Sequence, residues 1–184
     1  MTENNLKTKN LVNLGPSGRA VAQQMDASLL DNFYEHLTME RYANVQYFSI
    51  YLWFQERDLD GFASFFLNES QGEMEHAYKF ANYFIARGQT VKLRDLPAPI
   101  QTWDSIEDLI SYSFNMEADL TSSLQQLYSI SERISDTRTN VFLDPIVDAQ
   151  IKSEDEFAHI LGKVKFAANQ PSAILLIDSE LKKK

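Results

Sequence analysis

The sequence predicts an all-α fold, in which a bundle of four long helices is followed by a short fifth helix near the C-terminal end. Apolar residues recur at helical spacing, and no alternating run is long enough to compete as a strand. With 184 residues, a single domain is expected at 26–184, behind a flexible arm at 1–25 that carries few large apolar side chains. The expected helices are 28–55, 60–87, 104–132, 141–167 and 172–181.

The segments between these helices indicate how the helices pair. Asp60-Gly61 is expected to form a tight joint between the first two helices, and Gly88 suits a left-handed residue at the end of the second. Ser172 is a candidate N-cap for the fifth helix. The segment from Gly88 to Thr102, about 15 residues, has no helical period. When extended it can span roughly 50 Å, which is more than the length of a 28-residue helix. Two antiparallel helix pairs joined by a long crossover are therefore expected.

The composition excludes several classes of protein. The sequence has no cysteine, so it has no disulfide, zinc–thiolate site or iron–sulfur cluster, and oxygen or imidazole must hold any metal. Its formal charge of −9 argues against binding to nucleic acid. No apolar run approaches the roughly 20 residues of a membrane helix, and residues 1–10 lack a secretory signal. We expect a cytoplasmic protein with neither nucleic acid nor membrane as a partner.

Each long helix carries at least one polar residue in the middle of an otherwise apolar face. The second helix is the clearest case, because three polar residues interrupt a stripe of four phenylalanines. The residues that interrupt the four stripes are Glu40, then Glu69, Glu73 and His76, then Glu117, and finally Gln150. Their similar heights along the bundle predict that they converge at its centre.

These polar residues predict a metal site. Burying one lone carboxylate costs about several kcal/mol, and converging carboxylates repel one another, whereas a pair of divalent cations removes both difficulties. Oxygen ligands with one imidazole and no sulfur suit iron or manganese. In Glu73-x-x-His76 the two side chains lie on one side of a helical turn, so both can reach one metal, and Glu73 can bridge two. The alternative is a structural or interaction bundle that simply carries polar core residues.

Three segments resemble the ferroxidase-centre motifs of ferritins, and the similarity covers roughly residues 25 to 181. Pro171 to Leu181 is also similar to the short helix that lines the four-fold axis of ferritin cages. The resemblance implies a ferroxidase that oxidises Fe(II) with dioxygen. It also implies storage and detoxification of iron as a mineral inside a homo-oligomeric cage, of 24 subunits in the family. The three segments are Leu37 to Tyr42, Gln71 to His76 and Asn115 to Ala118.

The resemblance also implies a role for each central residue. Tyr47 matches a tyrosine that donates an electron or a hydrogen bond during oxygen reduction, although an ordinary core tyrosine is an equal alternative. Gln150 matches a glutamine that contacts the second site or lies just outside it. The ligands implied by position are Glu40, Glu73 and His76 for the first of two irons, and Glu73 and Glu117 for the second.

The family pattern further suggests how iron travels. Asp144 and Asp148 match the region that lines three-fold channels in ferritin cages, so they are candidates for iron uptake; a solvated acidic turn is the alternative. Glu69 could accept iron in transit. Some bacterial ferritins have a third iron site, but Gly72 and Ser153 occupy two of its positions here, which puts that site in doubt.

The sequence lacks one motif of related di-iron proteins, and this favours a storage function over other di-iron functions. Bacterioferritins, rubrerythrins and similar proteins carry a second Glu-x-x-His, whereas this chain has Gln150-x-x-Ser153 in its place. The second iron should therefore bind weakly, which suits storage. The alternative function is a di-iron oxidase or peroxidase of the rubrerythrin or bacterioferritin type that retains its metals. Met74 matches the haem-ligating methionine of bacterioferritins, but ferritins without haem share it, so no haem is predicted.

Overall fold

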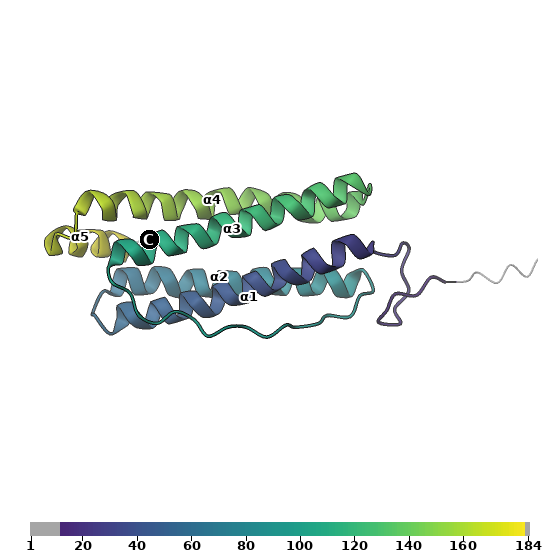
Figure 1. Ribbon diagram of the computed structural model, residues 1–184, viewed down its shortest axis with the longest axis horizontal. Coiled ribbons are helices and arrows are strands. Elements are labelled where there is room, and N and C mark those ends of the chain that lie inside the picture. The colour runs from purple at the N-terminus through teal and green to yellow at the C-terminus, as the bar shows by residue number, and fades with distance from the viewer. Residues whose placement is uncertain (1–11, 183–184) are drawn as a thin grey trace, which may run out of the picture.

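The computed structural model describes residues 12–182, and within that range it contains five helices and no extended strand (Figure 1). This confirms the predicted all-α fold. Among the described residues, no helix is both long and apolar enough to cross a membrane. The helices are α1 (Ala27–Gln55), α2 (Asp60–Ala86), α3 (Ile106–Arg133), α4 (Thr137–Ala167) and α5 (Pro171–Leu181).

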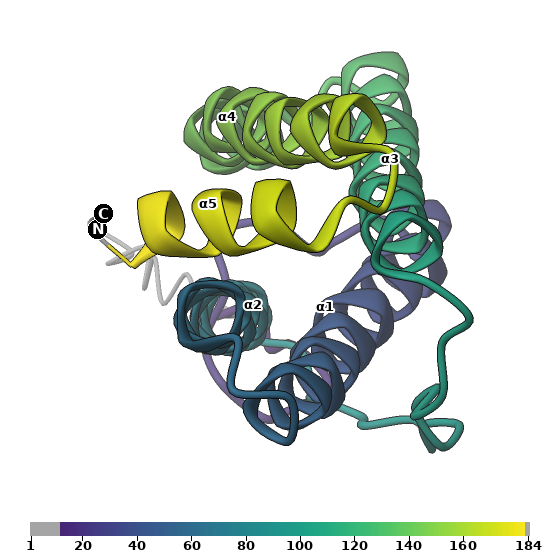
Figure 2. The same cartoon turned by 90° about the vertical axis from the view of Figure 1, so that its left-hand side faces the viewer.

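The four long helices form two antiparallel pairs, as predicted. The connection between α2 and α3 runs along the whole bundle, so α3 starts at the end of the molecule where α1 finishes (Figure 1). Viewed end-on, the four helices occupy the corners of a square, and α5 packs between α2 and α4 at one end (Figure 2). This connectivity places the middle turns of all four long helices around one central space.

The fourth helix begins at Thr137, four residues before the predicted start at 141. Asp136 is the N-cap, and its side chain accepts a hydrogen bond from the backbone N–H of Thr139. The same carboxylate forms a buried ion pair with Arg87, 2.8 Å away. The prediction that Ser172 caps the fifth helix is also wrong, because Gln170 takes that place and Pro171 occupies the first turn, where a missing N–H costs nothing.

The predicted joint at Asp60-Gly61 is wrong as well, because both residues belong to the first turn of α2. A Cβ on Gly61 would lie 1.8 Å from the backbone oxygen of Asp178, so only glycine allows α5 to approach this closely. Asp178 in turn accepts a hydrogen bond from the backbone N–H of Phe62 at 2.9 Å. Gly61 therefore serves the docking of α5.

Within residues 12–25 of the expected N-terminal arm, Gly15 and Ser17 contact Gly88 just beyond α2, whereas residues 1–11 lie outside the described residues. Gly88 has a φ of 72°, which confirms its predicted left-handed conformation. Its carbonyl oxygen accepts hydrogen bonds from the backbone N–H and the hydroxyl of Ser17, at 3.1 and 2.8 Å. A Cβ on Gly15 would lie 2.3 Å from the same oxygen, so two glycines permit this contact.

The buried apolar residues form two clusters at opposite ends of the bundle. One contains stacked aromatic rings such as Phe54, Phe62 and Phe66, and the other is built around Phe33 and Phe80. Neither cluster includes the buried polar residues Glu40, Glu73, Glu117 and Gln150. The core thus has a polar layer between two apolar ones.

Candidate metal centre

All four long helices contribute a buried polar side chain to the centre of the bundle. Glu40 comes from α1, Glu73 from α2, Glu117 from α3 and Gln150 from α4, and each is at most 5% exposed. His76, one turn beyond Glu73, has 20% of its side chain exposed. The predicted inner faces are therefore the observed inner faces.

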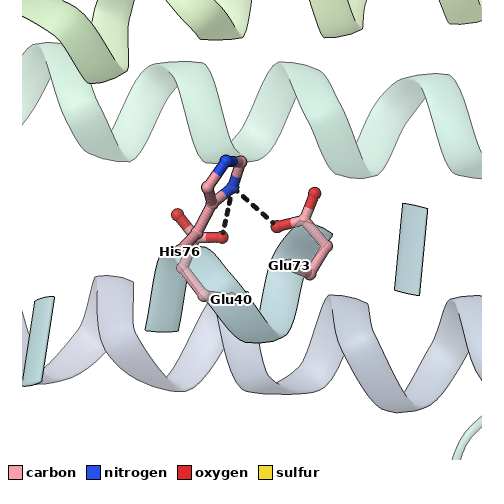
Figure 3. A group of neighbouring side chains, drawn as sticks. All are labelled: Glu40, Glu73 and His76. Carbon is pink, nitrogen blue, oxygen red and sulfur yellow. Dashed lines mark ion pairs between the residues drawn. The ribbon is translucent and has the colours of Figure 1, made fainter. Parts of the chain in front are cut away.

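Three of these side chains converge on one point (Figure 3). One ligand atom from each of Glu40, Glu73 and His76 lies within 4.8 Å of the other two. Nδ1 of His76 is 3.5 Å from Oε2 of Glu40 and 3.4 Å from Oε2 of Glu73. No described residue forms a hydrogen bond with either of these two buried oxygens. Two carboxylate oxygens and an imidazole nitrogen are thus presented together, as a metal ion requires.

Glu117 has different surroundings, because both of its oxygens have partners. The hydroxyl of Tyr47 donates to Oε1, and Nε2 of Gln150 donates to Oε2 at 2.8 Å. The same amide also lies 3.2 Å from the backbone oxygen of Glu117. Tyr47 is fully buried against the rings of Phe66 and Phe157. The structure therefore brings the predicted Tyr47 and Gln150 to Glu117.

Burial and mutual repulsion perturb the charges of these side chains. Burial raises the pKa of Glu73 well above its ordinary value, and the charge of Glu40 raises it further. Burial also acts to raise the pKa of Glu40, but the polar side chains around it, Glu73 first and then His36 and His76, hold it below its ordinary value. The two carboxylates raise the pKa of His76 to about 10, and burial raises that of Glu117. A divalent cation at this point would favour the ionised carboxylates and so displace the protons that the raised pKa values of Glu73 and Glu117 favour.

A model of one protein family matches most of the chain. The family described as ferritin-like domain matches residues 30–167, from the first turns of α1 to the end of α4. The chain belongs to the ferritin family. The ferritin-1 heavy chain of Schistosoma mansoni is 32% identical over 135 residues, which are 69% of this chain and 78% of the relative. The bacterial non-heme ferritin of Bacteroides fragilis is 29% identical over 147 residues, covering 80% and 91%.

Solved structures of ferritins have the same fold. An open pore ferritin from Archaeoglobus fulgidus aligns with a TM-score of 0.84 at 24% identity, covering 88% of this chain and 99% of the other. A PmFTN variant soaked in iron aligns with a TM-score of 0.80 at 30% identity, covering 84% and 98%. Membership of the ferritin family supports iron storage and ferroxidase activity in general.

The predicted transit residues of this ferritin lie apart from the three converging ligands. Glu69 is half-buried one turn before Glu73; burial, then the charges of Glu117 and Glu156, raise its pKa to about 7. Asp144 and Asp148 are on the exposed side of α4. Asp144 accepts a hydrogen bond from the hydroxyl of Tyr128 at 2.9 Å, whereas Asp148 pairs with a lysine one turn further along. Their part in iron transport remains a prediction.

One buried residue of the centre was missing from the sequence-based assignment. His36 is 0% exposed, and its Nε2 lies 2.8 Å from Oε1 of Glu40. The sequence contains a signal for this contact, because His36 precedes Glu40 by four residues and so lies on the same side of α1. The spacing of four residues thus places this imidazole beside the carboxylate of Glu40.

Proposed function

We propose that this chain oxidises Fe(II) with dioxygen at a two-iron ferroxidase centre and stores the Fe(III) as a mineral inside a homo-oligomeric cage. The observation that carries the proposal is the convergence of Glu40, Glu73 and His76, with two buried carboxylate oxygens that lack hydrogen-bond partners among the described residues. Oxygen ligands with one imidazole suit Fe(II), which is here the substrate. Two bound ions would supply electrons for the reduction of one oxygen molecule.

Glu40, Glu73 and His76 would bind the first iron, through the atoms that already face one another. Glu73 would have the central role, because it contacts His76 and experiences the charge of Glu117, and it would hold both ions. Its raised pKa means that it must release a proton when a metal binds. Metal binding by this half is therefore expected to strengthen as the pH rises.

Glu117 would complete the second iron site with Glu73. Each oxygen of Glu117 already accepts a hydrogen bond, so a metal must compete with Tyr47 and Gln150 for this carboxylate. That competition supports weak binding of the second iron, which suits an ion that moves onward into a mineral. Tyr47 would donate an electron or a hydrogen bond during oxygen reduction, because its hydroxyl contacts a ligand of this iron.

Glu69, half-buried and close enough to Glu117 to feel its charge, would pass iron between the centre and the surface. Asp144 and Asp148 would attract iron at the exposed face of α4, where three-fold channels form in ferritin cages. An assembly of 24 subunits is part of the proposal.

Aerobic addition of tens of Fe(II) ions per subunit to the purified full-length protein tests the function. We expect a soluble iron mineral that elutes with a large assembly in size-exclusion chromatography. Saturation at about two irons per subunit would instead indicate a di-iron oxidase or peroxidase of the rubrerythrin or bacterioferritin type. The lack of any iron uptake would leave a structural bundle.

A further inference from the structure

His36 joins α1 to α3 behind the metal centre. Its Nδ1 lies 3.0 Å from the hydroxyl oxygen of Ser123 on α3, and its Nε2 lies 2.8 Å from Oε1 of Glu40. The ring also packs against Phe80, with the ring centres 4.5 Å apart. The imidazole therefore has a close polar contact at each nitrogen and a ring contact on one face, and the proposed function assigns it no part.

The contact with His36 divides the two oxygens of Glu40. Oε1 faces His36, whereas Oε2 faces the side where His76 and Glu73 converge. Within residues 12–182, no hydrogen-bond partner reaches Oε2. The carboxylate thus presents one oxygen to the space between the ligands and keeps the other turned away from it.

The partners of His36 also determine which nitrogen carries its proton. An ionised carboxylate only accepts hydrogen bonds, so a stabilising contact with Oε1 requires the proton on Nε2. In a neutral imidazole, Nδ1 then has a free lone pair and accepts from the hydroxyl of Ser123. With the proton on Nε2, the hydroxyl of Ser123 donates to His36, and the Nε2–H group of His36 lies beside Oε1 of Glu40.

We infer that His36, held by Ser123, is a positioning residue that makes Glu40 bind metal through Oε2 alone. The inference rests on the proposed function only in taking Glu40 as a ligand. Without His36, Oε1 would lack its donor, and the carboxylate could turn to bind one metal through both oxygens. That rotation would take up coordination positions that Glu73 and His76 need. Partners that orient a metal ligand typically change metal affinity by about 10- to 100-fold when they are removed.

Three substitutions of His36 separate its two contacts. His36→Gln places an amide nitrogen close to the position of Nε2, so it keeps a donor for Glu40. His36→Asn places its amide close to the position of Nδ1, so it keeps a partner for Ser123 and loses the contact with Glu40. His36→Leu fills the space without either contact. Ser123→Ala removes the support of the ring, and His159→Asn, at an exposed histidine of α4, is the matched control.

The measurement is an anaerobic titration of the full-length assembled protein with Co(II), followed by calorimetry and by visible absorption, which reports the ligand geometry. We expect His36→Asn and His36→Leu to weaken the first Co(II) by about 10- to 100-fold and to change its spectrum. His36→Gln should stay within about threefold of the parent protein and keep the parent spectrum, and Ser123→Ala should fall between them.

Two results would overturn the inference. Parent affinity and spectrum in both His36→Asn and His36→Leu would show that Glu40 needs no positioning. Equal losses in His36→Gln and His36→Leu would show that the imidazole acts only as packing. If His36→Leu fails to assemble, the comparison of His36→Gln with His36→Asn decides alone. Failure of the parent protein to bind Co(II) would instead refute the proposed metal centre itself.

Discussion

The two halves of the proposed centre, Glu40–Glu73–His76 and Glu117, both present carboxylates, but these differ in their hydrogen bonds. In the first half, one oxygen of Glu40 and one of Glu73 lack hydrogen-bond partners among the described residues. In the second, Tyr47 and Gln150 occupy both oxygens of Glu117. The first half is ready for a metal, whereas the second must give up existing hydrogen bonds.

This difference predicts that the first half binds metal more tightly than the second, because a metal at Glu117 must displace existing hydrogen bonds. A hydrogen bond to a charged group contributes about 1.5–3 kcal/mol, so displacing the partners of Glu117 offsets part of the gain from the second metal. In the first half the cost is deprotonation, because the pKa of Glu73 is raised and its carboxyl group must lose a proton when a metal binds. Four substitutions test the comparison.

Glu73→Ala should have the largest effect, because it removes the ligand that both halves share. We expect the initial rate of Fe(II) oxidation, followed by stopped-flow absorbance, to fall by more than about 100-fold, the upper limit for residues that only support a ligand. The assembly should remain intact in size-exclusion chromatography. Glu75→Ala, at an exposed position on the same turn, is the control. A parent-like rate in Glu73→Ala would place the ferroxidase centre elsewhere.

Glu117→Gln should affect one half alone. The amide keeps an oxygen for Tyr47 but carries no charge, so we expect the number of Co(II) ions bound anaerobically to drop from two per subunit to one. The remaining ion should keep most of its affinity, because Glu40, Glu73 and His76 are all still present. Asp119→Asn, which neutralises an exposed acid two residues away, is the control. Loss of both ions would show that the halves form one inseparable site.

Gln150→Glu should make the second half more like the first, because it adds a further carboxylate beside Glu117. We expect the second metal to bind about tenfold more tightly, equivalent to about 1.4 kcal/mol. The calorimetric titration should show the two affinities moving closer together. Gln126→Glu adds the same charge to an exposed position of α3 and should change neither affinity. An unchanged second affinity would show that ligand number does not limit this half.

Glu69→Gln should have the smallest effect, on the pH dependence of stability without metal. The pKa of Glu69 is about 7 in the folded protein, whereas a glutamate without these interactions has a pKa of 4.5. The folded state therefore favours the protonated acid. This contribution is complete below pH 4.5 and is lost as the pH rises toward 7, by up to about 1.4 kcal/mol per pH unit. The variant keeps a neutral side chain throughout.

Thermal unfolding of the metal-free protein should therefore show Glu69→Gln gaining stability over the parent as the pH rises from 4.5 to about 7. Glu154→Gln, another half-buried acid of the bundle, serves as a comparison. If the difference in melting temperature between Glu69→Gln and the parent protein stays constant over this pH range, Glu69 keeps its ordinary pKa in the folded protein.

Helical periodicity predicted the inward placement of Glu40, Glu73 and Glu117 correctly, because a buried face repeats every turn along one segment. Contacts between distant segments carry no such signal. The start of α4 was missed because Asp136 is stabilised there by Arg87, 49 residues earlier. The hydrogen bonds of Glu117 depend on side chains from α1 and α4, so only the folded structure separates the two halves of the centre.

The carboxylate that completes the first turn of α2 is synthesised late. Asp178 follows Phe62 by 116 residues, so a ribosome must produce almost the whole bundle before that turn gains its hydrogen bond. The α1–α2 pair therefore leaves the ribosome before the first turn of α2 has this hydrogen bond and while its apolar face is still exposed to water. Seating of α5 against Gly61 is then among the last events of subunit maturation, and it links completion of the polypeptide to closure of the bundle.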